Sequence, residues 1–202
     1  MCCFSCPGVH LRQPTPEAFV PAYLLIALAI LSRLLLAAYP HSAGWFNFTA
    51  IGGALLFFGA RRSWREMLAP LAVLMATDYF LTTQIYSYSF RWQAYVTTWA
   101  WYAMAMALGW ILLHARNSFL RVAAGVLLGP TAFFVVSNYA VWAGGTMYPR
   151  SLAGLGECFI AGLPFYRNDL LSTGIVATLA FGVPVLVQRL KGTETQPALA
   201  SK

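Results

Sequence analysis

Long apolar runs, separated by short polar joins, make up most of this chain from residue 18 onward. A helix needs about 20 predominantly apolar residues to cross a bilayer, with a range of roughly 17–25. The pattern predicts six such helices, at about residues 18–39, 45–60, 67–85, 94–113, 120–142 and 169–189. The expected fold is an all-α integral membrane protein in which residues 18–190 form a single six-helix domain. Residues 1–17 and 191–202 are expected to be disordered cytoplasmic tails.

Two apolar segments differ from an ordinary span. The second run, residues 45–60, is short and rich in glycine and alanine, so we expect it to pack among other helices rather than face lipid. Residues 159–165 form an apolar island between polar residues, and this island is too short to cross a bilayer. We expect it to be a short outer-leaflet re-entrant or lid helix, ended by Pro164, that precedes the last span.

The composition agrees with a membrane protein, because 59% of the residues are hydrophobic and only 9% are charged. A soluble domain usually carries about 25% charged residues. The net charge of +7 would suggest nucleic-acid binding in a soluble chain. Here the basic residues lie beside the apolar runs, where they determine topology. We therefore expect the lipid bilayer, and no nucleic acid, as a partner.

The distribution of basic residues predicts the orientation. With the N-terminus in the cytoplasm, nine Lys and Arg residues fall on the inner side and three, Arg91, Arg150 and Arg167, fall outside. This asymmetry is what the positive-inside rule expects. The prediction is a multi-pass protein of the bacterial inner membrane with both termini cytoplasmic.

Polar side chains within the spans gather near the predicted outer ends. A polar group in hydrocarbon is costly, so by default it faces a cavity or a partner group. Arg33 and Asp78 each lie roughly 10 Å from an outer end, at a rise of about 1.5 Å per residue. We expect these groups to converge on an outward-facing pocket for a small molecule or ion. The predicted substrate-binding residues are Arg33, Asn47, Asp78, Asn138, Trp142, Tyr148, Glu157, Arg167 and Asp169.

A structural explanation remains open for each of these polar residues. Asp78 can pair with Arg33 in a buried ion pair that holds two helices in register. Asn138 can bond to a neighbouring backbone group, and Asp169 with Asn168 can cap the last helix. The aromatic residues of the outer loops can belong to an interfacial belt.

Catalytic chemistry has little support in the sequence. The three His residues, His10, His41 and His114, lie in the N-terminal tail and in loops on opposite sides. No His/Cys/Asp cluster has metal-ligand spacing, and no nucleophile or metalloprotease motif is found. We expect neither an enzyme nor a metal or cofactor site. The chain also lacks a P-loop, so an ATPase that drives transport would be a separate subunit.

Five stretches carry a resemblance to a known family: NFTAIGGALLFFGA at 47–60, TDYFLT at 77–82, FFVVSNYAVW at 133–142, YPRSLAGLGECFIAGLPFYRNDLL at 148–171 and LAFG at 179–182. Over residues 25–185 the chain resembles an uncharacterised bacterial family of membrane transport proteins, defined only as a domain of unknown function. In layout that family is similar to the substrate-binding S components of energy-coupling-factor (ECF) vitamin transporters. The similarity implies six helices, a ligand pocket near the outer face and an energy-coupling membrane subunit with ATPases as a partner.

The sequence thus predicts a membrane transport protein that captures a small solute, a vitamin-like molecule or an ion, in an outward-facing pocket. It would act alone or as an S-component-like binding subunit. The alternative is a non-transporting structural or assembly subunit of a membrane complex. The two hypotheses differ in one respect, since a binding protein needs an enclosed pocket lined by Asp78 and Asn138, whereas an assembly subunit would pack both faces tightly with no cavity.

Overall fold

The computed structural model describes residues 19–38, 48–115 and 118–194, and over these residues it is helical and contains no β-strand. The two predicted tails and Asn47 lie outside the described residues, apart from Lys191–Glu194. The α-helices are α1 (Phe19–Ala38), α2 (Ile51–Arg61), α3 (Leu68–Phe80), α4 (Val96–Leu113), α5 (Phe119–Gly144) and α6 (Leu152–Glu194). A 3₁₀ turn, Trp64–Met67, leads into α3, and another, Trp92–Tyr95, leads into α4. A π-helical turn, Leu81–Ile85, follows α3.

Five segments are long and apolar enough to cross a membrane: Val20–Ala38, Trp64–Ile85, Trp92–Leu113, Phe119–Gly144 and Leu152–Val187. These segments overlap five of the six predicted spans. The remaining one, α2, has 11 residues. At about 1.5 Å per residue it is roughly 16 Å long, about half the thickness of a hydrocarbon core. The chain is therefore an all-helical protein compatible with several membrane passes, in which the second predicted span is a short helix.

The side of α1 that faces away from the bundle is apolar. Leu24, Leu28 and Leu35 follow one another along one side of the helix and are half or more exposed. Ala22 and Ala29 lie on the opposite side and are fully buried. A continuous stripe of exposed leucine would be an aggregation hazard in water. In lipid the same stripe is the expected exterior of a transmembrane helix.

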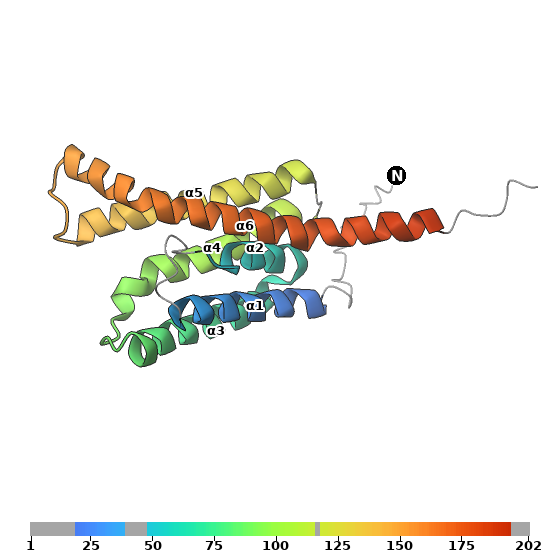
Figure 1. The fold of residues 1–202 in the computed structure, drawn as a ribbon, viewed down its shortest axis with the longest axis horizontal. Helices are drawn as coiled ribbons and strands as arrows, with labels where there is room; N and C mark the ends of the chain where they lie inside the picture. Colours follow the sequence, from blue (N-terminus) through green and yellow to red (C-terminus); the bar gives the residue numbers. More distant parts are fainter. Residues whose placement is uncertain (1–18, 39–47, 116–117, 195–202) are drawn as a thin grey trace, which may run out of the picture.

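Helix α2 lies at the centre of the bundle, as its glycine and alanine content predicts. Each residue from Ile51 to Ala60 is buried, and α2 packs against α1, α4, α5 and α6 (Figure 1). Its Phe58 is fully buried with the Tyr23 ring of α1 edge-on against it. The short α2 is thus the element around which the longer helices are arranged.

Glycines allow the backbones of α2 and α4 to touch. A Cβ on Gly59 would collide with the Met106 carbonyl, and a Cβ on Gly109 would collide with the Leu56 carbonyl. The contact is reciprocal, since each helix supplies one glycine and one carbonyl. Small residues at helix contacts are the usual route to close approach in membranes, where no hydrophobic force drives helices together.

Helix α6 differs from the prediction for the last span. Residues 152–194 form one helix that includes both Pro164 and Pro184, so Phe159–Phe165 is helical but continues directly into the span. The separate lid helix ended by Pro164 is not observed. Proline is tolerated in the interior of membrane helices when neighbouring groups compensate for the lost hydrogen bond. The start of α1 and the end of α6 lie at the same end of the bundle, and α5 and α6 form a hairpin along one side (Figure 1).

The glycine contact predicts a large stability effect from a single methyl group. Gly59→Ala and Gly109→Ala should each cost about 1–3 kcal/mol, because the clash is with backbone that cannot rotate away. Gly182→Ala is the matched control, since Gly182 is exposed on α6 and a methyl group added there would have nothing within 4 Å. Thermal unfolding of the purified variants in detergent measures the difference. Equal melting temperatures for Gly59→Ala and Gly182→Ala would contradict the close contact.

Candidate functional site

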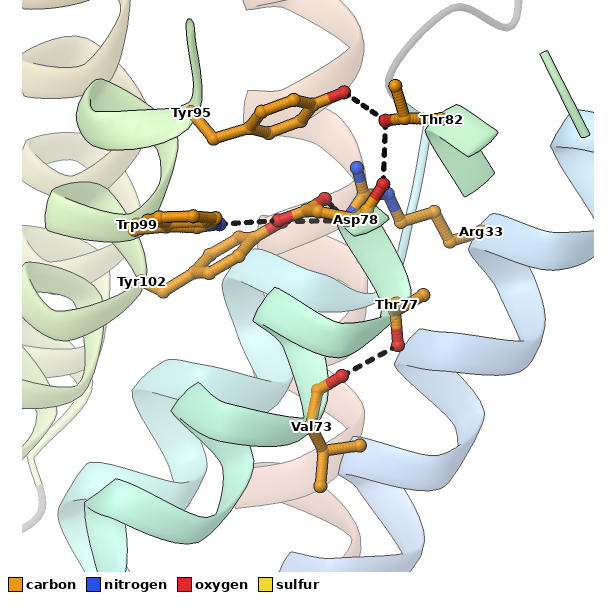
Figure 2. Close-up of polar contacts among 8 residues, drawn as sticks. All are labelled: Arg33, Val73, Thr77, Asp78, Thr82, Tyr95, Trp99 and Tyr102. Carbon is orange, nitrogen blue, oxygen red and sulfur yellow. Dashed lines mark hydrogen bonds and ion pairs between the residues drawn. The ribbon is translucent and has the colours of Figure 1, made fainter. Parts of the chain in front are cut away.

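The predicted pair of Arg33 and Asp78 is formed. Arg33 Nη1 lies 2.5 Å from Asp78 Oδ1 and donates to the Tyr102 hydroxyl at 2.7 Å. Trp99 Nε1 donates to Asp78 Oδ2 at 2.9 Å, and the Tyr102 hydroxyl donates to Oδ1 at 3.4 Å. Figure 2 shows the carboxylate of α3 enclosed between the arginine of α1 and the two rings of α4.

The backbone around Asp78 is tied to the same group of side chains. The Thr82 hydroxyl donates to the Asp78 carbonyl at 2.7 Å and also contacts the Tyr95 hydroxyl (Figure 2). The rings of Tyr95 and Trp99 are stacked 6.0 Å apart. Helix α3 changes to its π-helical turn directly after this region, at Leu81. The Asp78 carboxylate is thus held by side chains of α1 and α4, and its backbone carbonyl is held by Thr82.

These contacts satisfy Asp78 internally. Its side chain is fully buried, while that of Arg33 is 23% exposed, and both carboxylate oxygens have partners. A buried ion pair of this kind stabilises a structure only when further hydrogen bonds complete it, as they do here. The buried ion pair with Arg33 that the sequence left open for Asp78 is therefore formed. Nothing about this carboxylate requires a ligand.

A second polar group lies between α5 and α6, whose facing residues line a cavity of about 200 Å³. Asn138 and Asp169 are both in its wall. Most of the remaining lining is apolar or aromatic. The full lining consists of Pro130, Phe133, Phe134, Ser137, Asn138, Gly162, Phe165, Tyr166 and Asp169.

Asn138 is oriented by contacts on both helices. Its Nδ2 donates to the Phe134 carbonyl at 2.7 Å, which is the backbone bond that the sequence left open. The Cys158 thiol donates to the Asn138 carbonyl at 3.4 Å. Gly162 of α6 faces the amide so closely that a Cβ there would approach Asn138 Oδ1 to 2.5 Å. Glycine at 162 therefore makes room for the amide in the cavity wall.

Asp169 has no comparable structural explanation. Because α6 begins at Leu152, this residue lies deep inside the helix and does not cap it, so the capping interpretation is wrong. The side chain is only 7% exposed. Its Oδ1 accepts one long hydrogen bond, from Thr173 at 3.5 Å. No ion pair joins Asp169 to a cation in the described part of the chain.

The structure places the other predicted site residues away from this cavity. Trp142 Nε1 donates to the Pro149 carbonyl at 2.9 Å and closes the α5–α6 turn, in which Tyr148 is half-buried. Glu157 and Arg167 are exposed on α6. The remaining predicted positions form two groups, Arg33 with Asp78 and Asn138 with Asp169. Among the described residues, no hydrogen bond or ion pair joins one group to the other.

Sequence reasoning missed a third polar group, at the opposite end of the bundle from the α5–α6 turn. Arg62 is buried and pairs with Glu66, which also accepts hydrogen bonds from the Ser63 hydroxyl at 2.8 Å and from Tyr23 at 3.3 Å. The spacing of Ser63 and Glu66, three residues apart before an apolar run, is a capping box that could have revealed it. Like the Asp78 group, this one is satisfied internally.

Comparison with known protein families gives a match over nearly the whole chain. A family model described as a family of unknown function (DUF6580) matches residues 13–196. The chain belongs to DUF6580. No curated protein and no solved structure matches this DUF6580 protein. Within the described residues, no group of three His, Cys, Asp or Glu side chains could hold a metal ion.

The internal pairing of Asp78 predicts a structural phenotype. Asp78→Ala should lower the free energy of unfolding by about 3–5 kcal/mol, because it leaves Arg33 buried without its partner. The double variant Arg33→Gln with Asp78→Asn removes both charges and should recover part of that loss. Unfolding of the three proteins in detergent tests this coupling. If the single and double variants were equally destabilised, the ion pair would not be the source of the effect.

Proposed function

We propose that this DUF6580 protein is a transport protein of the bacterial inner membrane that captures a small solute from the outer side in the cavity between α5 and α6. It would act alone or as the binding subunit of a larger transporter with a separate energy-coupling module. The observation that carries the proposal is Asp169, a buried carboxylate without a counter-ion among the described residues that lines this cavity together with Asn138.

The contrast between two aspartates supports the proposal. Asp78 is enclosed by an arginine and two aromatic donors, whereas Asp169 has a single long bond from a threonine. An ionisable group within a membrane segment is costly and usually marks a ligand or ion pathway when it is not paired. The cavity wall combines a few polar groups with apolar and aromatic ones, as small-molecule sites do.

The proposed outward orientation rests on charge. The α5–α6 turn and the loop before α4 are the ends that the distribution of Lys and Arg assigns to the outside. Asn138 lies in the half of α5 near that turn, and Asp169 lies in the half of α6 near it. Under this orientation both polar groups of the cavity lie in the outer half of the bundle.

The competing function is an assembly subunit that binds no solute. The filled surroundings of Asp78 fit that alternative as well as they fit a transporter. The cavity beside Asn138 does not, because an assembly subunit has no need for a buried unpaired carboxylate facing open space. Solute access to the cavity distinguishes the two functions, because only a transport protein requires it.

Accessibility of a cavity thiol tests the proposal. Ser137→Cys places a thiol in the cavity wall, and a membrane-impermeant maleimide added to intact cells should label it. Thr146→Cys in the exposed α5–α6 turn should also be labelled from outside. His114→Cys, exposed at the opposite end of the bundle, should be labelled only after the cells are permeabilised. The unchanged protein supplies the background from its native cysteines.

Two results would count against the proposal. If Ser137→Cys stayed unlabelled while Thr146→Cys reacted, the cavity would be closed to solutes from the outside and the assembly function would be favoured. If His114→Cys reacted in intact cells, the orientation would be reversed.

A second experiment asks whether the cavity polar groups serve binding. Thermal-shift screening of the purified protein against vitamins and small cations should yield a stabilising compound. Its effect should be lost in Asn138→Ala and retained in the charge-neutral variant Arg33→Gln with Asp78→Asn. Asn138→Ala removes an amide from the cavity wall without opening an ion pair. A compound that stabilises both variants as much as the unchanged protein does not bind in this cavity.

A further inference from the structure

We infer that the cavity between α5 and α6 takes a small organic cation, a protonated amine whose ammonium group pairs with the Asp169 carboxylate and whose apolar body packs against aromatic rings. This inference rests on the proposed function of the same cavity and names the class of its solute.

Charge is the first argument. Asp169 is the only charged residue in the lining, so an ionised carboxylate gives the cavity a net negative charge. The two arginines among the predicted site residues do not pair with it, because Arg33 pairs with Asp78 and Arg167 is exposed on α6. An ionised carboxylate taken out of water without a partner costs several kcal/mol. A cationic ligand would supply the charge that the described part of the protein does not provide.

Hydrogen bonding is the second argument. Asp169 Oδ2 accepts no hydrogen bond from the described residues, and Asn138 Nδ2 is already engaged by the Phe134 carbonyl. The Tyr166 hydroxyl shares a 3.0 Å contact with Thr131. The groups with remaining capacity are therefore mainly acceptors, the carboxylate oxygen Oδ2 and Asn138 Oδ1, which accepts only a 3.8 Å contact from the Cys158 thiol. Acceptors select a ligand that carries N–H donors.

The rings are the third argument. The four aromatic side chains in the lining are Phe133, Phe134, Phe165 and Tyr166, and the rings of Phe134 and Tyr166 lie 4.8 Å apart. Aromatic faces attract cations and also bury the apolar part of an amine. A hard metal cation would instead need about six oxygen ligands, which this lining does not offer. The composition thus favours an organic cation over an inorganic one.

Size guides the choice of probe. A cavity of about 150 Å³ holds a molecule as large as benzene. At about 200 Å³ the present cavity, which is open on one side, accommodates at least a molecule of that class. Benzylammonium is such a molecule, and benzyl alcohol is a neutral probe of nearly the same shape with the same number of non-hydrogen atoms.

The test compares these probes on the full-length protein in detergent. Benzylammonium should raise the melting temperature, whereas benzyl alcohol and the anion benzoate should not. Asp169→Asn, which keeps the shape of the side chain and removes its charge, should weaken benzylammonium binding by about 30-fold or more. Glu157→Gln is the matched control, because it removes a carboxylate from an exposed position of the same helix and should leave binding unchanged.

The probe experiment tests the class of solute, whereas the labelling experiment tests access to the cavity, so either one can fail without the other. Equal stabilisation by benzylammonium and benzyl alcohol would overturn the inference, as would undiminished cation binding by Asp169→Asn or no response to benzylammonium at millimolar concentration. If Asp169→Asn did not fold, the comparison of the charged and neutral probes on the unchanged protein would still decide. Labelling of Ser137→Cys from outside without cation binding would retain the cavity and reject only this class of solute.

Discussion

The close contact between the backbones of α2 and α4 determines how the rest of the bundle is arranged. Gly59 and Gly109 each meet a carbonyl of the facing helix, and this allows a helix of 11 residues to be buried on all sides. Because α2 occupies the centre, α1, α4 and α6 pack around it, and α5 is held mainly by α4 and α6. The cavity lies between α5 and α6, which contact each other more than either contacts α2.

The described structure manages its buried charges in two ways. Asp78 is fully buried and has an arginine and further donors, so the electrostatic cost of its burial is offset within the protein. Glu66, whose side chain is 27% exposed, likewise has an arginine and a hydroxyl donor. At Asp169 this compensation is missing, although the residue is only 7% exposed. The satisfied Asp78 makes Asp169 more informative, because the same chain evidently can surround a buried carboxylate with donors.

The sequence predicted helix bounds well where the length of the apolar run sets them, and poorly where contacts with neighbouring helices set them. The bounds of α1 and α5 lie close to those expected from hydrophobic length alone. The continuity of α6 was missed because Pro164 and the flanking charges indicate a break when neighbouring helices are unknown. Polar depth predicted Asn138 and Asp169 as site residues, but it could not separate them from Arg33 and Asp78. The depth of a residue along a helix axis does not determine which neighbouring helix its side chain faces. That depends on the rotation of each helix about its own axis when it packs in the bundle.

The length of α6 ties the cavity to the thickness of the membrane. Its 43 residues extend about 65 Å, roughly twice the hydrocarbon core, so in a bilayer part of the helix would stand outside the core even at a tilt of about 40°. Asp169 lies about 25 Å along the axis from Leu152. In the proposed membrane protein, a thicker or thinner bilayer would change how far such a helix tilts, and with the tilt the depth of the carboxylate. Lipid chain length would then be a physical variable that acts on the proposed site without any contact to it.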